Sequence, residues 1–157
     1  MTTAKGGCAC DQVRYEVELP ALFVHCCHCT RCQRQSGAAF ALNAMIEANR
    51  VRLTSGELEV IDTPSESGKG QNVCRCLICK TAVWSIYAGA GSKFLFLRVG
   101  AMDKPEHVPP DIHIFTDSKQ AWVQLPADAP AVPEFYDRKA YWPPESLERM
   151  HQAIATD

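Results

Sequence analysis

The sequence predicts a mainly β protein with metal sites and a short helix near its C-terminus. Three observations support this fold class: apolar and polar residues alternate over residues 13–19, nine cysteines fall into tight clusters, and the last stretch carries apolar residues at helical spacing. The 157 residues are 46% hydrophobic, so one domain of ordinary size can bury a core of its own.

Residues 13–19 give the clearest strand signal. Val13, Tyr15 and Val17 alternate with charged residues, and a period of two suits a strand with one buried face. Residues 54–56, with the sequence Thr-Ser-Gly, are interpreted as a hairpin turn. Further short strands are predicted at residues 40–46, 51–53, 58–61, 81–87, 94–99 and 112–115.

Helices are predicted at two places. Residues 31–36, which a glycine follows, form one short candidate. From Pro144 onward, Leu147, Met150 and Ile154 share one side of a helix because they stand at positions i, i+3 and i+7.

Two polar or irregular stretches connect these elements. Residues 62–72 are rich in Ser, Gly and Pro, which predicts a mobile surface loop, and the Ala/Pro-rich residues 126–133 are expected to be irregular. The simplest division is therefore a metal-binding domain at residues 1–136 and a partly helical tail at residues 137–157.

Clustered cysteines are typical of metal sites, although redox dithiols and structural disulfides are the alternatives. A disulfide framework belongs to secreted chains, and the polar segment from Met1 to Cys8 lacks the apolar core of a secretion signal. We therefore expect a reducing, cytoplasmic setting and metal binding. The nine cysteines are Cys8, Cys10, Cys26, Cys27, Cys29, Cys32, Cys74, Cys76 and Cys79.

Charge and hydropathy exclude two classes of partner. The formal net charge is -2, and no run of lysine and arginine offers the phosphate contacts of a dedicated nucleic-acid binder. No segment approaches the roughly 18 apolar residues that a membrane span needs. The oligomeric state cannot be inferred from the sequence.

The cysteine spacing predicts two zinc sites of different kinds. The pattern CxCxxC occurs at residues 27–32 and again at residues 74–79, whereas Cys8 and Cys10 supply only CxC. Pairing the CxC with one trio would complete a closed structural site, and the other trio would hold zinc by three ligands with one position left for water or substrate. Spacing alone does not say which trio is which.

Four motifs in order resemble the glutathione-dependent formaldehyde-activating enzyme family, which also includes centromere protein V. They are GGCACDQVRYEV, CHCTRCQRQSGAAFA, CLICKTAVW and DIHIFTDSKQAWVQL. The resemblance implies small twisted sheets built around zinc. It also implies that Cys8, Cys10, Cys76 and Cys79 form the closed site, and that Cys27, Cys29 and Cys32 form the open site, whose zinc is the more labile.

The same resemblance implies a carbon-sulfur lyase that joins formaldehyde and glutathione to S-(hydroxymethyl)glutathione. Zinc would hold glutathione as its thiolate or polarise the aldehyde oxygen. A different thiol- or aldehyde-handling enzyme and a non-catalytic, zinc-stabilised binding module are the alternatives, because one fold hosts many functions.

Residues near the clusters have functional and structural interpretations. Arg31 and Arg34 could bind glutathione carboxylates or be solvated, and His28 is expected in a supporting or surface role. His113 is a candidate pocket residue. Trp122 could also line the pocket, but a place in the core is favoured because buried tryptophans usually contribute packing.

Two further cysteines and two residues at the turns complete the predictions. Cys26 and Cys74 are interpreted as spare or buried thiols. Asp11 and Lys80 follow Cys10 and Cys79 at positions where a zinc knuckle often needs a positive φ, which aspartate tolerates better than lysine.

Overall fold

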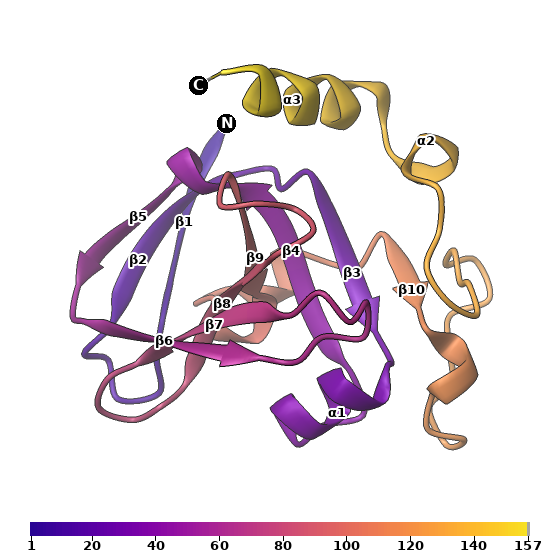
Figure 1. Cartoon of the computed structure of the whole chain (residues 1–157), viewed down its shortest axis with the longest axis horizontal. Coiled ribbons are helices and arrows are strands. Elements are labelled where there is room, and N and C mark those ends of the chain that lie inside the picture. Colours follow the sequence, from indigo (N-terminus) through magenta and orange to yellow (C-terminus); the bar gives the residue numbers. More distant parts are fainter. Residues whose placement is uncertain (157) are drawn as a thin grey trace.

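The computed structural model describes residues 1–156 and shows a β structure with helices at its margins (Figure 1). The strands are β1 (Thr2–Gly7), β2 (Arg14–Leu19), β3 (Phe23–Cys27), β4 (Ala41–Glu47), β5 (Val51–Ser55), β6 (Leu58–Thr63), β7 (Gln71–Cys76), β8 (Ala82–Tyr87), β9 (Phe94–Arg98) and β10 (Ile112–Ile114). The α-helices are α1 (Thr30–Ser36), α2 (Arg138–Tyr141) and α3 (Pro144–Ala155). The prediction of a mainly β fold with a short C-terminal helix is confirmed.

The strands form two sheets. A three-stranded sheet has the order β1-β2-β5, and a seven-stranded sheet has the order β10-β3-β4-β9-β8-β7-β6. Neighbours are antiparallel except β10, which lies parallel to β3 and places His113 opposite Cys26. This parallel pair brings a segment from the last third of the chain to the edge of the sheet where β3 ends.

The predicted hairpin at residues 54–56 is wrong. β5 pairs with β2 and β6 pairs with β7, so the turn carries the chain from one sheet to the other. Gly56 has φ 81°, and a Cβ there would lie 2.4 Å from the carbonyl oxygen of Gln12. The glycine is therefore required by the close approach of the β1–β2 turn.

Three strands were not predicted. β1 is polar and half-exposed, β3 is buried at every position, and β7 begins inside the stretch expected to be a loop. The loop itself is shorter than expected because residues 62 and 63 pair with residues 72 and 71. None of the three strands shows the apolar alternation by which the others were recognised.

The core has two parts. One lies between the sheets, where Tyr15 meets Trp84 edge to face with ring centroids 5.6 Å apart. The other lies around the end of β3 and includes Trp142 and Met150 from the C-terminal segment. Trp142 stacks on Phe23 at 5.3 Å, which fixes that segment over the sheet.

The predicted helix of the tail is present as α3. Met150 is buried, Leu147 packs against the core and Ile154 is exposed. Arg149 donates two hydrogen bonds to the carboxylate of Glu47, at 2.9 and 2.7 Å, which ties the helix to β4. The division at residue 136 remains a prediction.

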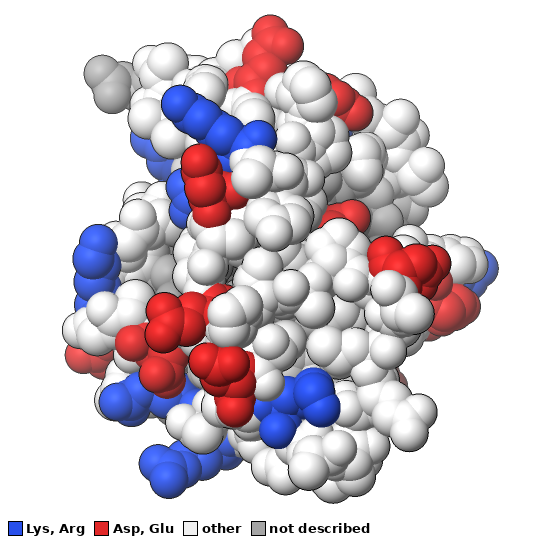
Figure 2. Space-filling view, turned by 90° about the vertical axis from the view of Figure 1, so that its right-hand side faces the viewer, with Lys and Arg blue, Asp and Glu red and all other residues white. Residues whose placement is uncertain are grey.

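The surface gives two further observations. The face that carries β10 and α2 has charged side chains mainly near its margins, with a broad uncharged area between them (Figure 2). Within residues 1–156, no helix combines the length and the apolar character needed to traverse a bilayer.

Candidate metal centres and cavity

Four thiols from two turns come together at one end of the sheets. Cys8 and Cys10 lie between β1 and β2, Cys76 ends β7, and Cys79 lies in the turn from β7 to β8. The Sγ atoms of Cys8 and Cys10 are 3.5 Å apart, and those of Cys10 and Cys76 are 3.9 Å apart. Sulfurs about 3.8 Å apart are expected around a tetrahedral zinc with Zn–S bonds of about 2.3 Å. We call these residues the four-thiol group.

In each of the two turns a backbone N–H donates to the sulfur of the first cysteine, from different offsets along the chain. The N–H of Val13 donates to Cys8 Sγ at 3.3 Å, and the N–H of Ile78 donates to Cys76 Sγ at 3.4 Å. Asp11 and Lys80 adopt φ 59° and 62°, so the positive φ expected after each second cysteine is observed. Backbone donors aimed at sulfur favour the thiolate form, which is the form that binds metal.

A second group of thiols lies where β3 runs into α1. Cys27 ends the strand, Cys29 caps the helix and Cys32 is in its first turn. All three are buried, and their Sγ atoms lie within 4.8 Å of one another. The N–H of Cys32 donates to Cys29 Sγ at 3.4 Å. We call these residues the three-thiol group.

The three thiols do not titrate alike. Hydrogen bonds from the thiols of Cys27 and Cys32 lower the pKa of Cys29 to about 2. The pKa of Cys27 is raised because its thiol donates hydrogen bonds to Cys29 and Cys32. The three-thiol group therefore carries one thiolate readily. A metal cation that replaces the two remaining thiol protons would stabilise the other two thiolates.

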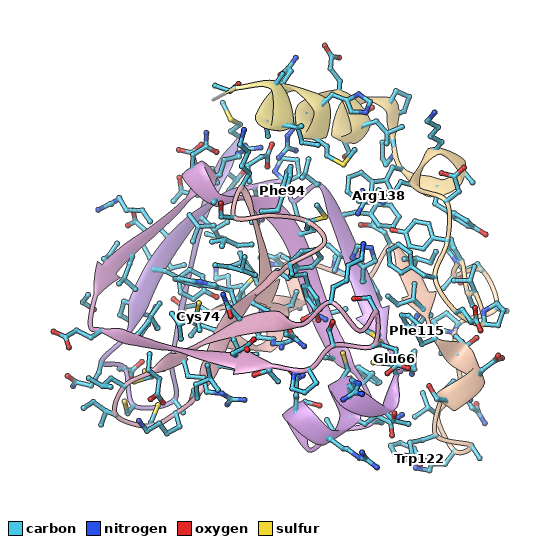
Figure 3. The ribbon with its side chains drawn as sticks, in the orientation of Figure 1. Glu66, Cys74, Phe94, Phe115, Trp122 and Arg138 are labelled. Carbon is cyan, nitrogen blue, oxygen red and sulfur yellow. The ribbon has the colours of Figure 1, made fainter. Side chains whose placement is uncertain are left out.

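A cavity of about 440 Å³ adjoins the three-thiol group. Its walls are largely apolar, and its charged lining comes from α1, the β6–β7 loop and α2. Figure 3 shows Glu66, Phe115 and Arg138, from three separate segments, on the side of the ribbon where β3 and β10 lie. Arg31 and Lys69 also line this cavity, which therefore has three cationic side chains at its margin.

One buried hydrogen-bonded network holds His25, which lines the cavity. Trp142 Nε1 donates to Tyr136 Oη at 2.8 Å, and His25 Nε2 lies 2.6 Å from the same oxygen. Burial lowers the pKa of His25 to about 4 and raises the pKa of Tyr136, so both groups are neutral at pH 7. If the Tyr136 hydroxyl donates to Nε2, the imidazole proton sits on Nδ1, an atom that is buried without a partner in the described structure.

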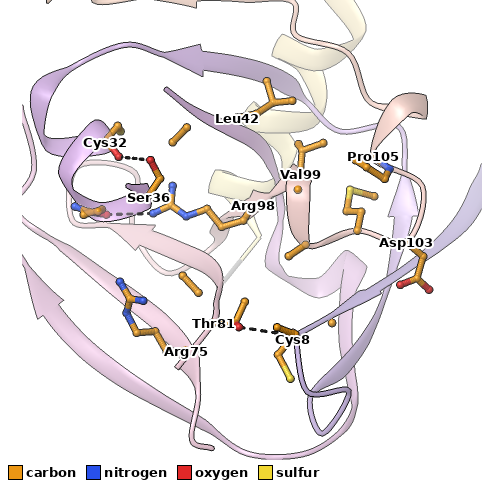
Figure 4. Close-up of a pocket in the computed structure, with 18 of the residues that line it drawn as sticks. Cys8, Cys32, Ser36, Leu42, Arg75, Thr81, Arg98, Val99, Asp103 and Pro105 are labelled. Atoms are coloured by element: carbon orange, nitrogen blue, oxygen red, sulfur yellow. Dashed lines mark hydrogen bonds between the residues drawn. The ribbon is translucent and has the colours of Figure 1, made fainter. Parts of the chain in front are cut away.

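A larger groove of about 770 Å³ runs between the two thiol groups (Figure 4). The charged side chains of this groove already have hydrogen-bond or ion-pair partners within the protein. The Arg98 guanidinium donates to Asn43, to Ser85 at 2.9 Å and to Gln35 at 3.3 Å, and Arg14 pairs with Asp103. The smaller cavity, with its unpaired histidine nitrogen and buried thiols, is therefore the better candidate for chemistry.

The structure divides the nine cysteines into the two thiol groups and two cysteines outside them, Cys26 and Cys74. The seven predicted zinc ligands fall into the four-thiol and three-thiol groups that the resemblance implied, and their role as ligands remains a prediction. Cys74 is buried in the core beside Trp84 (Figure 3), away from both groups. All nine cysteines are free thiols.

Other predictions fare differently. Arg31 lines the cavity and forms an ion pair of 3.7 Å with Glu66, whereas Arg34 is exposed and is not among the lining residues. His28 is fully buried and not on the surface. The placement of Trp122 in the core is wrong, because its side chain is 74% exposed in the segment after β10.

Sequence reasoning missed His25, Lys69, Tyr136 and Arg138. For His25 a signal existed: it stands two residues before Cys27, so on a strand both side chains point to the same face. Recognition of β3 would have placed this histidine beside the thiols. The other three come from segments whose position depends on tertiary packing alone.

The chain is similar to a protein family and to a solved structure. Residues 3–118, more than half of the chain, match the family described as glutathione-dependent formaldehyde-activating enzyme, and this range includes both thiol groups. A crystal structure of a Rhodobacter sphaeroides protein, a structural genomics target, is similar over 63% of this chain and 87% of that chain, with 20% identity and a TM-score of 0.49.

Proposed function

Because the chain belongs to the glutathione-dependent formaldehyde-activating enzyme family, which indicates an enzyme of that type, we propose that it is a zinc-dependent carbon-sulfur lyase. On this proposal it forms and cleaves S-(hydroxymethyl)glutathione. The observation that carries the proposal is a buried three-thiol group that borders a cavity. The nine free thiols support a reducing, cytoplasmic setting.

The donor sets fit zinc in two different ways. Four thiolates complete a tetrahedral shell, so Cys8, Cys10, Cys76 and Cys79 would hold a structural ion. Three thiolates leave one position, so Cys27, Cys29 and Cys32 would hold an ion that accepts a further sulfur ligand. Zinc bound there would favour the thiolate form of glutathione next to the cavity.

The cavity margin matches the charges of glutathione, which carries two carboxylates. Lys69 and Arg138 line the cavity, and neither forms an ion pair with a carboxylate of residues 1–156. Arg31 is only partly engaged, by Glu66 at 3.7 Å. These cations would orient the tripeptide so that its sulfur lies toward the thiol group and its charged ends toward solvent.

Formation of the adduct places negative charge on the aldehyde oxygen. The glutathione sulfur attacks the carbonyl carbon, a C–S bond forms, the C=O π electrons move to oxygen, and that oxygen then takes a proton from water. The His25 Nδ1–H, held by Tyr136 and Trp142, would donate a hydrogen bond to this oxygen. Donors preorganised in a dry site are worth more than the same donors in water.

The proposal is tested by exchange NMR with glutathione and formaldehyde. The reaction proceeds slowly without a catalyst, so the measured quantity is the exchange rate between free glutathione and its adduct above the uncatalysed rate. We expect acceleration by the wild-type protein, none by Cys29→Ser, and full acceleration by the control Cys74→Ser, which removes a buried thiol outside both groups. Equal rates for wild type and Cys29→Ser would reject the lyase proposal.

A further inference from the structure

A third cluster of potential ligands lies on the opposite face of the strand that bears the three-thiol group. Cys26 and His28 alternate with Cys27 and Cys29, so their side chains point the other way. The parallel strand β10 places His113 directly opposite Cys26. From the sequence, Cys26 is interpreted as a spare thiol and His28 as a supporting residue. In the fold, both lie next to His113, which is 85 positions beyond His28.

We propose that Cys26, His28 and His113 form a further binding site for a zinc ion. Their donor atoms lie within 4.8 Å of one another. Cys26 Sγ is 3.6 Å from His28 Nε2, and His28 Nε2 is 3.0 Å from His113 Nδ1. The proposal concerns residues outside the proposed active site and does not depend on the lyase function.

These distances are close to those of a zinc site. Bonds of about 2.3 Å to sulfur and about 2.05 Å to nitrogen in a tetrahedron separate sulfur from nitrogen by about 3.6 Å, and nitrogen from nitrogen by about 3.4 Å. The first matches the separation of Cys26 and His28. The expected separation of the two nitrogens is about 0.4 Å longer than the 3.0 Å between His28 Nε2 and His113 Nδ1. The two imidazole rings would move apart by this amount when their direct N–H···N hydrogen bond is replaced by two bonds to the ion.

The chemistry of the three donors is selective. A thiolate with two imidazoles suits zinc and copper, whereas magnesium and calcium prefer oxygen ligands. All three side chains are buried, with exposed fractions of 2%, 0% and 7% for Cys26, His28 and His113. The outer nitrogens, His28 Nδ1 and His113 Nε2, have no partner in the described structure, so nothing there opposes the tautomers that direct both lone pairs at the ion.

Charge gives such an ion a role beside the proposed active site. Zinc on three thiolates has a formal charge of -1, and zinc on one thiolate and two neutral imidazoles has a formal charge of +1. Because Cys26 and Cys27 are consecutive, the two charges would lie on opposite faces of one strand end and offset each other. Binding would also fix β10 against β3, whose ends form part of the cavity wall.

Metal content tests the proposal. Protein expressed with zinc and freed of loosely bound ions is measured for zinc per chain, as wild type, Cys26→Ser, His113→Gln and the control Cys74→Ser. We expect Cys26→Ser and His113→Gln each to lose one zinc relative to wild type, and Cys74→Ser to lose none. Unchanged zinc content in folded Cys26→Ser and His113→Gln would overturn the site.

Cobalt substitution separates this site from the thiol groups and from misfolding. With Co²⁺ in place of zinc, Cys26→Ser should remove the absorption of one mixed sulfur and nitrogen site, and Cys29→Ser should remove a different, sulfur-rich spectrum. If only Cys29→Ser changes the spectrum, the third site is rejected while the proposed function stands. If only Cys26→Ser does, the third site stands and zinc at the three-thiol group is rejected.

Discussion

The four-thiol group and the three-thiol group use the same residue in nearly the same spacing, yet they are built differently. The first joins two turns that are 66 residues apart, with Cys10 and Cys79 reaching the surface. The second belongs to a single strand-to-helix junction, with every sulfur buried next to a cavity. The four-thiol group links two distant turns of the fold, and the three-thiol group lines a cavity.

This difference shows that the surroundings of a cysteine cluster decide its role. A turn whose N–H groups donate to cysteine sulfur is suited to hold a structural ion. A junction beside a cavity with cationic side chains at its margin can also receive a molecule. Variants of the two groups should therefore fail in different ways, the first in folding and the second in activity.

Replacement of Cys76 should have the largest effect. Cys76 is fully buried and contacts Cys10, so Cys76→Ala would remove a proposed zinc ligand and leave a gap between the two turns. Structural zinc contributes on the order of 10 to 16 kcal/mol in small peptides, which is comparable to the whole stability of a domain. We expect insoluble or unfolded protein by circular dichroism. A folded variant with the zinc content of wild type would contradict the assignment.

Replacement of His25 should affect activity and leave folding nearly intact. His25→Gln removes the imidazole that lines the cavity and is proposed to donate to the aldehyde oxygen, and loss of one such donor costs on the order of 100-fold in kcat. Tyr136→Phe, which frees the ring of His25 and removes the acceptor of the Trp142 Nε1–H, should cost less in kcat and leave the KM for glutathione unchanged. Wild-type kcat in folded His25→Gln would remove His25 from the mechanism. Both rates come from the same NMR exchange measurement.

Replacement of Lys80 should have the smallest effect and the opposite sign. Its φ of 62° is strained for a side chain with a Cβ, so Lys80→Gly should raise the free energy of unfolding by about 0.5 to 1 kcal/mol. The loss of its exposed ion pair with Glu59 offsets only part of this gain. Denaturant unfolding of the zinc-bound protein measures the change, with Asp11→Gly as the matched control, since aspartate tolerates this conformation better. A destabilised Lys80→Gly would contradict the strain argument.

The sequence allowed prediction of those elements that carry their own local pattern. The alternation from Val13 to Leu19 predicted β2, and the glycine after residue 36 predicted the end of α1, where Gly37 has φ 66°. β3 gave no such signal because all five residues are buried, and with it His25 was missed. Long-range pairing, such as that of β10 with β3, leaves no local pattern.

Cys74 shows why spacing could not separate the two trios. It precedes Cys76 as Cys27 precedes Cys29, but it pairs with Trp84 of β8. Both Cys74 and Cys76 belong to the core between the sheets, yet only the sulfur of Cys76 lies within 4.8 Å of the other sulfurs of the four-thiol group. The motif repeats in sequence and differs in three dimensions.

Part of the cavity lining comes from outside the range that matches the family. The family match ends at residue 118, whereas Phe135 and Arg138 border the cavity from beyond that point. The three-thiol group and part of the cavity lining are thus encoded in separate stretches of the gene. On the proposed function, mutation or exchange of the C-terminal stretch would change which thiol or aldehyde is accepted while the three-thiol group is inherited intact.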